Sequence, residues 1–184
     1  MAYYFFPQVI PKSECKRLLN YCLNCSDFIS GTIGPEAKQT KKRNNHVSFV
    51  EDEDNTMRDM LWGFIRHANE QFFNYDLSFF QTLKFSRYRR GEYYGWHQDS
   101  VTKDKKETRK LSLSFNITPH DNYDGGYLEF YNGGDRSFNL KLREKMKTVG
   151  SVVVFDSRDW HRVTPVTRGI RYSIVCWTIG PKFV

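Results

Sequence analysis

The chain has 184 residues and a mass of 21.9 kDa, the size of about one domain, which is enough to bury a core without disulfide or metal cross-links. Its 28 Lys and Arg against 21 Asp and Glu give a formal charge of +7, and its 15 Phe, 11 Tyr and 4 Trp make it rich in aromatic residues. That composition excludes a disordered polypeptide. No apolar run approaches the length of about 18 residues that a membrane span needs.

The N-terminal segment and the cysteines indicate the compartment. The first residues, MAYYFFPQVIPK, have neither a basic stretch nor a long apolar one, so we expect no signal peptide and a soluble, cytoplasmic protein with no membrane partner. Its thiols should then be reduced. Cys22 and Cys25 form a C-x-x-C pair, which would suit a redox or zinc site. Because both recur with Cys15 and Leu18 at helical spacing, we favour the buried face of a helix.

Residues 1–78 are predicted to form a mainly helical support region. Residues 3–10 indicate a strand, and a helix is expected from Pro11 to Cys25 with Ser13 as its N-cap. The polar and basic residues 31–46 are typical of a long loop, a natural lid over a substrate. A second helix is predicted from Asn55 to Phe73, with the acidic residues 51–54 at its N-terminus. Its predicted buried face comprises Met57, Leu61, Phe64, Ala68 and Phe72.

From residue 79 on, short aromatic and β-branched segments alternate with turn residues. Strands are expected near 79–89, 93–97, 111–117, 126–131, 137–142, 151–156 and 170–178. Segment 111–117 alternates most clearly, with Leu111, Leu113, Phe115 and Ile117 on one face and polar residues on the other. Helices followed by short strands predict a mainly β fold, a sandwich or jelly-roll barrel buttressed by N-terminal helices. We expect one domain over residues 1–184, with the barrel at 79–180.

Three residues of the predicted barrel have the chemistry of a metal site. His97 and Asp99 stand two apart, so on an extended strand both side chains would point to one face. His161 follows the buried strand 151–156. Two His and one carboxylate match the facial triad that holds non-haem Fe(II) with open positions. Asp159 is an alternative carboxylate, but we prefer Asp99, because Asp159 lies at a strand exit where alternation need not hold.

Arg171 and Ser173 form another i, i+2 pair on one face of the last predicted strand. A keto-acid co-substrate needs a cation for its far carboxylate, and the guanidinium offers a planar fork for two hydrogen bonds. A buried arginine would be costly unless an anion meets it. The pair therefore indicates a site for an organic acid.

Five segments together resemble the Fe(II)/2-oxoglutarate-dependent dioxygenases, and among them the prolyl 4-hydroxylase branch with its small stand-alone bacterial and viral members. In chain order the segments are YRRGEYYGWHQD (88–99), RKLSLSFNI (109–117), YDGGYLEF (123–130), VGSVVVFD (149–156) and HRVTPVTRGIRYSIVCW (161–177). The resemblance covers about residues 79–180 and implies a double-stranded β-helix (jelly-roll or cupin-like) core. It implies hydroxylation of an unactivated C–H, in this branch of a prolyl residue in a protein or peptide. The implied cofactors are Fe(II), 2-oxoglutarate, O₂ and, as reductant, L-ascorbate, with succinate and CO₂ as co-products.

The resemblance also implies roles for single residues. His97, Asp99 and His161 would bind Fe(II), and Arg171 would bind the distal carboxylate of 2-oxoglutarate. The remaining matches are Tyr88 and Ser173 in the co-substrate pocket, Tyr94 near the metal, and Arg109 and Trp177 near the substrate. One position departs from the pattern, because Asn116 stands where many prolyl hydroxylases have a tyrosine that helps to bind the distal carboxylate. Asn116 can donate a hydrogen bond and is therefore also expected to bind 2-oxoglutarate, but it is shorter than tyrosine, so the details of that end of the pocket stay open.

Other functions compete with this hypothesis. The basic charge invites an oxidative nucleic-acid demethylase, but such enzymes carry R-x-N-x-T-x-R where this chain has Ser173 and Trp177. Free amino acids are a further substrate class. A cupin-like binding module or a zinc hydrolase is disfavoured, since neither uses a triad together with Arg171. The cations Lys38, Lys41, Lys42 and Arg43 could contact nucleic acid, but we favour a solvated loop. His46, His67 and His120 are expected to be surface or capping residues.

The positive charge is concentrated near the predicted site. Residues 84–110 hold nine Lys or Arg against four acids, and residues 158–171 hold four Arg against one Asp. Charge at these places would attract dianionic 2-oxoglutarate and an acidic protein substrate. The charge therefore does not favour nucleic acid.

Overall fold

The computed structural model describes residues 3–32, 41–100, 106–133 and 136–183, with the backbone alone at 136–138. The helices of these parts are α1 (Lys12–Asn24), α2 (Thr56–Ala68), α3 (Arg136–Lys147), a π-helical turn (Asn69–Phe73) and a 3₁₀ turn (His120–Asn122). The strands up to residue 97 are β1 (Tyr3–Phe6), β2 (Ile29–Ser30), β3 (Arg43–Asn44), β4 (His46–Phe49), β5 (Phe79–Phe80), β6 (Lys84–Tyr88) and β7 (Tyr93–His97). The later strands are β8 (Glu107–Asn116), β9 (Tyr123–Gly125), β10 (Leu128–Phe130), β11 (Val152–Asp156), β12 (His161–Val163), β13 (Val166–Gly169) and β14 (Arg171–Pro181).

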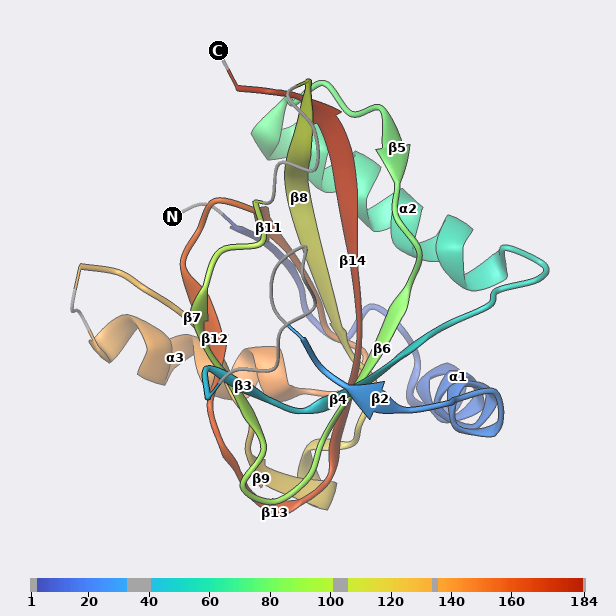
Figure 1. Ribbon diagram of the computed structural model, residues 1–184, viewed down its shortest axis with the longest axis vertical. Coiled ribbons are helices and arrows are strands. Elements are labelled where there is room, and N and C mark those ends of the chain that lie inside the picture. Colours follow the sequence, from blue (N-terminus) through green and yellow to red (C-terminus); the bar gives the residue numbers. More distant parts are fainter. Residues whose placement is uncertain (1–2, 33–40, 101–105, 134–135, 184) are drawn as a thin grey trace.

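The strands form a large and a small antiparallel sheet. The large sheet has the order β1-β11-β8-β14-β6-β4-β2, with β5 also paired to β14, and the small sheet has the order β10-β12-β7-β3. Strands β9 and β13 form a separate pair. Figure 1 shows the long strands β8 and β14 side by side, with β7 and β12 apart from them. The mainly β fold expected from the sequence is confirmed as a double-stranded β-helix.

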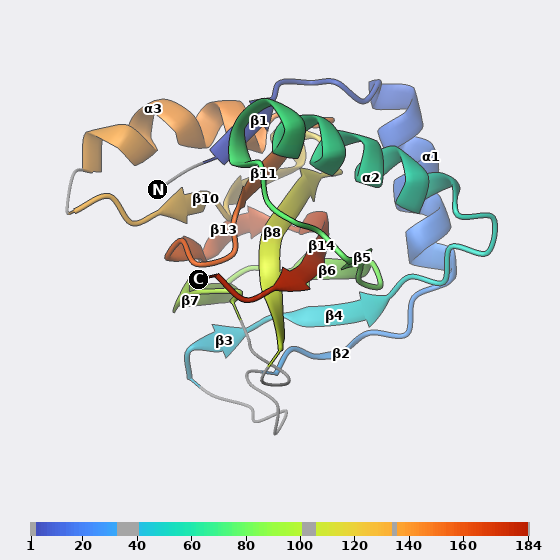
Figure 2. The ribbon, with the colours of Figure 1, turned by 90° about the horizontal axis from the view of Figure 1, so that it is seen from above.

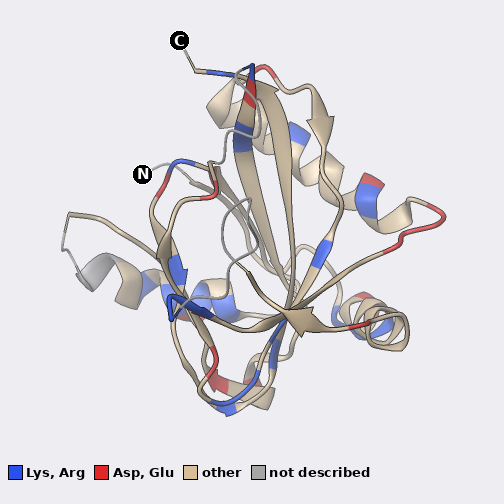
Figure 3. Cartoon of the chain, in the orientation of Figure 1, with Lys and Arg blue, Asp and Glu red and all other residues tan. Residues whose placement is uncertain are grey.

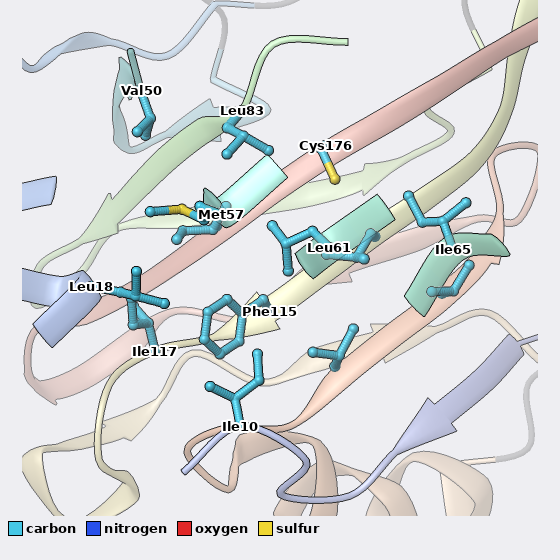
Figure 4. Close-up of a cluster of buried hydrophobic side chains, with 14 of the residues drawn as sticks. Ile10, Leu18, Val50, Met57, Leu61, Ile65, Leu83, Phe115, Ile117 and Cys176 are labelled. Carbon is cyan, nitrogen blue, oxygen red and sulfur yellow. The ribbon is translucent and has the colours of Figure 1, made fainter. Parts of the chain in front are cut away.

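The main core lies between the large sheet and the helices. Figure 2 shows α1 and α2 together on one side of β8, β14 and β6. Leu61 and Ile65 of α2 and Leu18 of α1 belong there to one buried cluster with Phe115 of β8 (Figure 4). Leu111 of β8 belongs to the same cluster. The predicted apolar face of 111–117 is therefore confirmed, since the four residues are at most 1% exposed. Within the described residues, none of the helices is long and apolar enough to cross a membrane.

Both N-terminal helices form where the sequence predicts them, with differences at their ends. Ser13 is not the N-cap of α1, since Pro11 holds that position and no side chain caps the helix. The carboxylate of Asp52 accepts the backbone N–H groups of Met57 and Arg58, as the acidic cluster before α2 predicts. The predicted face of α2 is wrong at its end, because the π-helical turn rotates Phe72 outward, where it is 55% exposed. Ile65 takes its place in the core.

The cysteines of α1 are structural. Cys15 and Cys22 lie on its buried face as predicted, whereas Cys25 is exposed. All four cysteines of the chain are free thiols. Burial raises the pKa of Cys15 to about 11 and that of Cys22 to about 12, so neither forms a reactive thiolate near neutral pH.

Two predicted segments differ from the structure. The strand expected at 137–142 is wrong, because these residues belong to α3. Leu142 and Met146, four residues apart, pack on a small cluster around Phe130 and Phe155. Side chains with this spacing lie on one face of a helix, so the packing favours a helix over a strand. The loop expected at 31–46 includes β3 and the start of β4, while its residues 33–40 lie outside the described residues. The lid hypothesis is therefore left as an expectation.

Candidate metal and co-substrate site

A cavity of about 440 Å³ is lined by residues of both sheets. The large sheet contributes the face of β14 that is turned away from the helices, with Arg171, Ser173, Val175 and Trp177 at every second position. The small sheet contributes His97 at the end of β7 and His161 at the start of β12. The two strands pair with His97 directly opposite His161. Pairing between sequence-distant strands thus brings the two histidines into one wall.

His97, Asp99 and His161 form a compact group whose ligand atoms all lie within 4.8 Å of one another. Asp99 Oδ1 lies 3.6 Å from His97 Nε2, and Asp99 Oδ2 lies 3.4 Å from His161 Nε2. All three residues are buried. The structure therefore brings the three predicted metal ligands together.

Backbone carbonyl groups hold both imidazole rings. His97 Nδ1 lies 2.8 Å from the carbonyl oxygen of Gly95, and His161 Nδ1 lies 2.9 Å from that of Asp159. Because a carbonyl can only accept, each Nδ1 carries the proton and each Nε2 is left to bind a cation. Burial and the neighbouring His161 lower the pKa of His97 to about 3, so this ring is neutral. Burial also disfavours a charged His161, but Asp99 outweighs that effect and raises its pKa.

The carboxylate of Asp99 is held by hydroxyl and indole donors. Ser112 Oγ donates to Asp99 Oδ2 at 2.9 Å and lies 2.9 Å from Ser157 Oγ. Burial alone would raise the pKa of Asp99, but the two histidines and a hydrogen bond from Trp177 lower it well below its usual range. Asp99 therefore stays ionised. Ser112 belongs to the polar face of β8, and the alternation of that strand is the signal that could have identified it.

The alternative carboxylate, Asp159, does not belong to this group. It takes part through its backbone carbonyl, which accepts from His161. His46, His67 and His120 also lie outside the group, paired respectively with Glu92, Tyr4 and Asp121. His46 contacts the buried carboxylate of Glu92, so it is less exposed than expected.

Arg171 lies at the other end of the same cavity and is 4% exposed. Its Nη1 donates to Ser173 Oγ at 2.9 Å, and its guanidinium carbon lies 5.4 Å from the centre of the Tyr88 ring. No described carboxylate forms an ion pair with it. The predicted residues Arg171, Ser173 and Tyr88 thus form one buried cationic pocket, in which the described part of the chain supplies no anion.

Asn116 lies behind this pocket instead of in its wall. Its amide nitrogen donates to the carbonyl groups of Thr118 and Lys147, and its amide oxygen accepts from the hydroxyl of Tyr123. Tyr123, fully buried, also forms a hydrogen bond with Arg171. A tyrosine hydroxyl therefore reaches Arg171 from β9. This contact is not predicted from the pattern of β8, because Tyr123 stands seven positions after Asn116 on another strand.

The remaining predicted residues flank the triad. The ring of Tyr94 stacks on that of His97, with centroids 3.5 Å apart and an angle of 10°. The guanidinium of Arg109 stacks on Trp177 at 4.0 Å, and its Nε donates to Gln81 Oε1 at 2.8 Å. Arg109 and Trp177 both line the cavity. Lys42, Arg43 and Lys84 also line it. Lys42 is exposed, as the prediction of a solvated loop implies, whereas Arg43 is half-buried and departs from that prediction.

The residues present fit an iron ion. Two imidazole nitrogens and one ionised carboxylate on a single wall leave the cavity side open, as a three-ligand site with exchangeable positions requires. A buried cation at this point would also compensate the charge of Asp99, which otherwise stands among the two imidazoles.

The family comparison agrees with this geometry. A model of the 2OG-Fe(II) oxygenase superfamily matches residues 83–179, more than half of the chain and close to the predicted barrel. The chain belongs to this superfamily. It is 36% identical over 96 residues to a PKHD-type hydroxylase of Synechococcus sp. (strain CC9605), over 52% of this chain and 40% of that protein. It is 31% identical over 150 residues to one of Hyphomonas neptunium, over 79% of this chain and 63% of that protein. The chain thus spans less than two thirds of these curated relatives.

Solved structures share the fold. A viral collagen prolyl hydroxylase from Paramecium Bursaria Chlorella virus-1, in its 2OG complex, superimposes with a TM-score of 0.70 at 19% identity, over 98% of this chain and 97% of that one. A prolyl hydroxylase from Trichoplax adhaerens, in complex with a peptide fragment of hypoxia inducible factor, gives 0.76 at 18% identity, over 96% and 82%. These likenesses establish the double-stranded β-helix.

Proposed function

We propose that the protein is an Fe(II)- and 2-oxoglutarate-dependent dioxygenase that hydroxylates an unactivated C–H bond, that of a prolyl residue in a protein or peptide. One observation carries the proposal. The triad of His97, Asp99 and His161 and the unpaired buried cation Arg171 line the same cavity, in a chain of the 2OG-Fe(II) oxygenase superfamily. A keto acid needs both a metal and a distant cation.

Each residue of the triad has a defined task in this proposal. His97 Nε2, His161 Nε2 and one oxygen of Asp99 would hold Fe(II), while Gly95, the Asp159 carbonyl and Ser112 keep the donor atoms in place. Iron, when bound, supplies O₂ activation coupled to the oxidation of 2-oxoglutarate to succinate and CO₂. The protein's residues supply orientation and exclude water.

Arg171 would bind the distal carboxylate of 2-oxoglutarate. Its guanidinium can give two parallel hydrogen bonds, and Ser173 adds a hydroxyl next to it. Tyr88 covers the cation with its ring, and Tyr123, held by Asn116, supports it from behind. A fixed cation at one end and a metal at the other determine which way round the co-substrate binds.

A polypeptide substrate is favoured by the residues at the metal side. Trp177 stands where a nucleic-acid demethylase would have its second arginine, and it closes the cavity beside Asp99. Among the fold neighbours are prolyl hydroxylases, one of them in complex with a peptide. A free amino acid remains the second substrate class that the same cofactors could serve.

Two finer proposals concern the surroundings of the reaction. We expect L-ascorbate to act as the reductant that returns oxidised iron to Fe(II). The four free thiols agree with a reducing compartment, which supports a cytoplasmic location.

The experiment is a substrate screen by mass spectrometry. Protein loaded with Fe(II) is incubated with 2-oxoglutarate, ascorbate and proline-containing peptides, and we expect peptide masses that rise by about 16 Da, one oxygen atom, with succinate formed in equal amount. His161→Ala should form neither product. Release of formaldehyde from methylated oligonucleotides, with no peptide oxidised, would refute the prolyl assignment.

A further inference from the structure

Two sets of arginines in this protein differ in their partners. On the outer surface Arg17, Arg158, Arg162 and Arg168 each pair with a carboxylate, at 2.5–2.7 Å. In the cavity, Arg43, Arg109 and Arg171 form no ion pair with any carboxylate that the structure describes. Asp99 is the one carboxylate among the described residues that line the cavity. Arg171 has its anion in the proposed co-substrate, which leaves Arg43 and Arg109 to be explained.

Arg43 is held beside the triad from the small sheet. Strand β3 pairs with β7 so that Arg43 lies opposite Tyr94, and its guanidinium carbon lies 4.4 Å from the centre of that ring. The ring of Tyr94 in turn stacks on His97. Neutral groups, the carbonyl of Thr32 and the amide oxygen of Asn45, accept its hydrogen bonds. The ring of Tyr94 therefore lies between the guanidinium of Arg43 and His97, one of the three predicted metal ligands.

Arg109 has the same arrangement on the large sheet. It stacks on Trp177, whose indole forms a hydrogen bond with Asp99, and its hydrogen-bond partner Gln81 is neutral. Lys84 lies over the same indole at 4.7 Å. Burial lowers the pKa of Arg109, which reflects the cost of holding this charge away from water. Figure 3 shows the basic residues on β3, β6 and β8, the strands that carry Arg43, Lys84 and Arg109.

Arg109 cannot share the anion that Arg171 binds. Trp177, on which Arg109 stacks, stands six residues beyond Arg171 on the same face of β14, which is about 20 Å of extended strand. A five-carbon diacid extends over roughly 7 Å, the reach of two extended residues. The anion bound by Arg171 therefore does not account for Arg109, which lies on the metal side of the cavity.

We propose that Arg43 and Arg109 bind a carboxylate of the primary substrate, so that the enzyme selects an acidic peptide with Asp or Glu next to the hydroxylated residue. The inference rests on the proposed function for the chemistry at the metal. It adds the substrate class, because two planar guanidinium groups on either side of the triad fit carboxylates close to the reacting carbon.

The placement of these cations separates a peptide from a nucleic acid. An enzyme that acts on an extruded base takes the neutral base into its pocket and leaves the phosphates outside, on a basic surface. Here the cations stand in the cavity wall, half-buried and stacked on Tyr94 and Trp177. An anion must therefore enter the cavity itself, which an acidic side chain can do.

Binding of three fluorescent peptides tests the proposal. Each has a central proline flanked on both sides by Glu, Gln or Lys, and each is titrated into protein that holds 2-oxoglutarate and Mn(II), an unreactive substitute for Fe(II). The Glu peptide should bind at least about tenfold more tightly than the Gln peptide, as expected for charged hydrogen bonds, and the Lys peptide most weakly. Arg109→Gln and Arg43→Gln should each reduce that preference. Arg109→Glu should reverse it toward the Lys peptide.

Arg168→Gln is the matched control, since it removes one positive charge from an exposed surface pair and should leave the preference unchanged. Equal binding of the three peptides, no binding of any, or tighter binding of a single-stranded oligonucleotide would overturn the proposal. Displacement by free glutamate at the same concentration as the Glu peptide would overturn the assignment to a peptide and give the carboxylate site to free amino acids.

The same peptides separate this inference from the proposed function. Succinate formation with Fe(II) and no preference for Glu would overturn the inference alone. A preference for Glu that Arg109→Gln removes, without any oxidation of 2-oxoglutarate, would overturn the proposed function alone.

Discussion

The two faces of strands β8 and β14 differ in what they contact. One face carries Leu113, Phe115 and Ile174 into the core beneath the helices. The other face carries Ser112, which holds Asp99, and Arg171, which lines the cavity. Successive side chains of a strand point to opposite faces, so neighbouring residues of β8 or β14 contribute either to the core or to the cavity. Changes on the helix face should therefore alter stability, and changes on the cavity face should alter binding.

The largest effect on binding is expected from Asp99→Ala on the cavity face. The variant removes the one anionic ligand of the triad, and we expect Fe(II) or Mn(II) affinity to fall by more than about 100-fold, beyond the loss that follows when a supporting residue is changed. Isothermal titration with Mn(II) measures it. Unfolding in urea should show that the fold persists, because no apolar contact is lost. Unchanged metal affinity would refute the assignment of the ligand.

The matched change on the helix face is Phe115→Ala. Phe115 is fully buried beneath α2, and removing its ring should lower the free energy of unfolding by about 3–5 kcal/mol. Urea unfolding followed by circular dichroism measures this loss. Variant protein that is still folded should bind Mn(II) as the wild type does. A loss of metal affinity as large as that of Asp99→Ala would break the division between the two faces.

A more selective effect is expected from Arg171→Ala. Loss of its charged hydrogen bonds should raise the Kd for 2-oxoglutarate by about 10- to 100-fold, while Mn(II) affinity stays near that of the wild type. Arg171→Lys keeps the charge and loses the planar fork, so its Kd for 2-oxoglutarate should lie between those of the wild type and Arg171→Ala. An unaltered Kd for 2-oxoglutarate in Arg171→Ala would remove the co-substrate role from this residue.

The smallest effect concerns a cluster that belongs to neither face. Asp156 Oδ2 accepts a hydrogen bond from the Tyr75 hydroxyl and forms an ion pair with Arg158 Nη2, each at 2.6 Å. Burial alone would raise the pKa of Asp156, but these partners outweigh it and lower the pKa. Because the folded-state pKa is below the unfolded value of about 3.9, the stabilisation is complete above that pH and is lost as pH falls through the folded-state pKa.

Asp156→Asn tests this cluster. At pH 7 the variant should be less stable than the wild type by about 2 kcal/mol, and the difference should shrink as the pH falls below about 4. Urea unfolding of both proteins at several pH values measures it. A difference that stays constant down to acid pH would show that the charge of Asp156 does not stabilise the fold.

Local periodicity explains which parts of the structure could be predicted. The alternation of 111–117 predicts the buried face of β8, and the spacing of His97 and Asp99 predicts that both side chains reach one site. The same reasoning fails at 137–142, where apolar residues at every second position suggest a strand. Contacts of Leu142 and Met146 with the cluster on β10 and β11 make it a helix. Six residues are too few to separate the two periods.

Long-range pairing explains what the sequence could not provide. Arg43 reaches the triad because β3 pairs with β7, a contact between residues about 50 positions apart. Tyr123 reaches Arg171 from a third strand, so counting along β8 leads to Asn116 instead. Neither contact leaves a local pattern, since each depends on the way the two sheets close around the cavity.

The most direct test of the central claim is an anaerobic absorption titration. Protein is mixed with Fe(II) and then with 2-oxoglutarate in the absence of O₂, and a keto acid that chelates iron gives a weak visible charge-transfer band. We predict this band for the wild type and its absence for His161→Ala. No band in the wild type, or an equal band in both proteins, would contradict the proposal that this cavity holds iron and 2-oxoglutarate together.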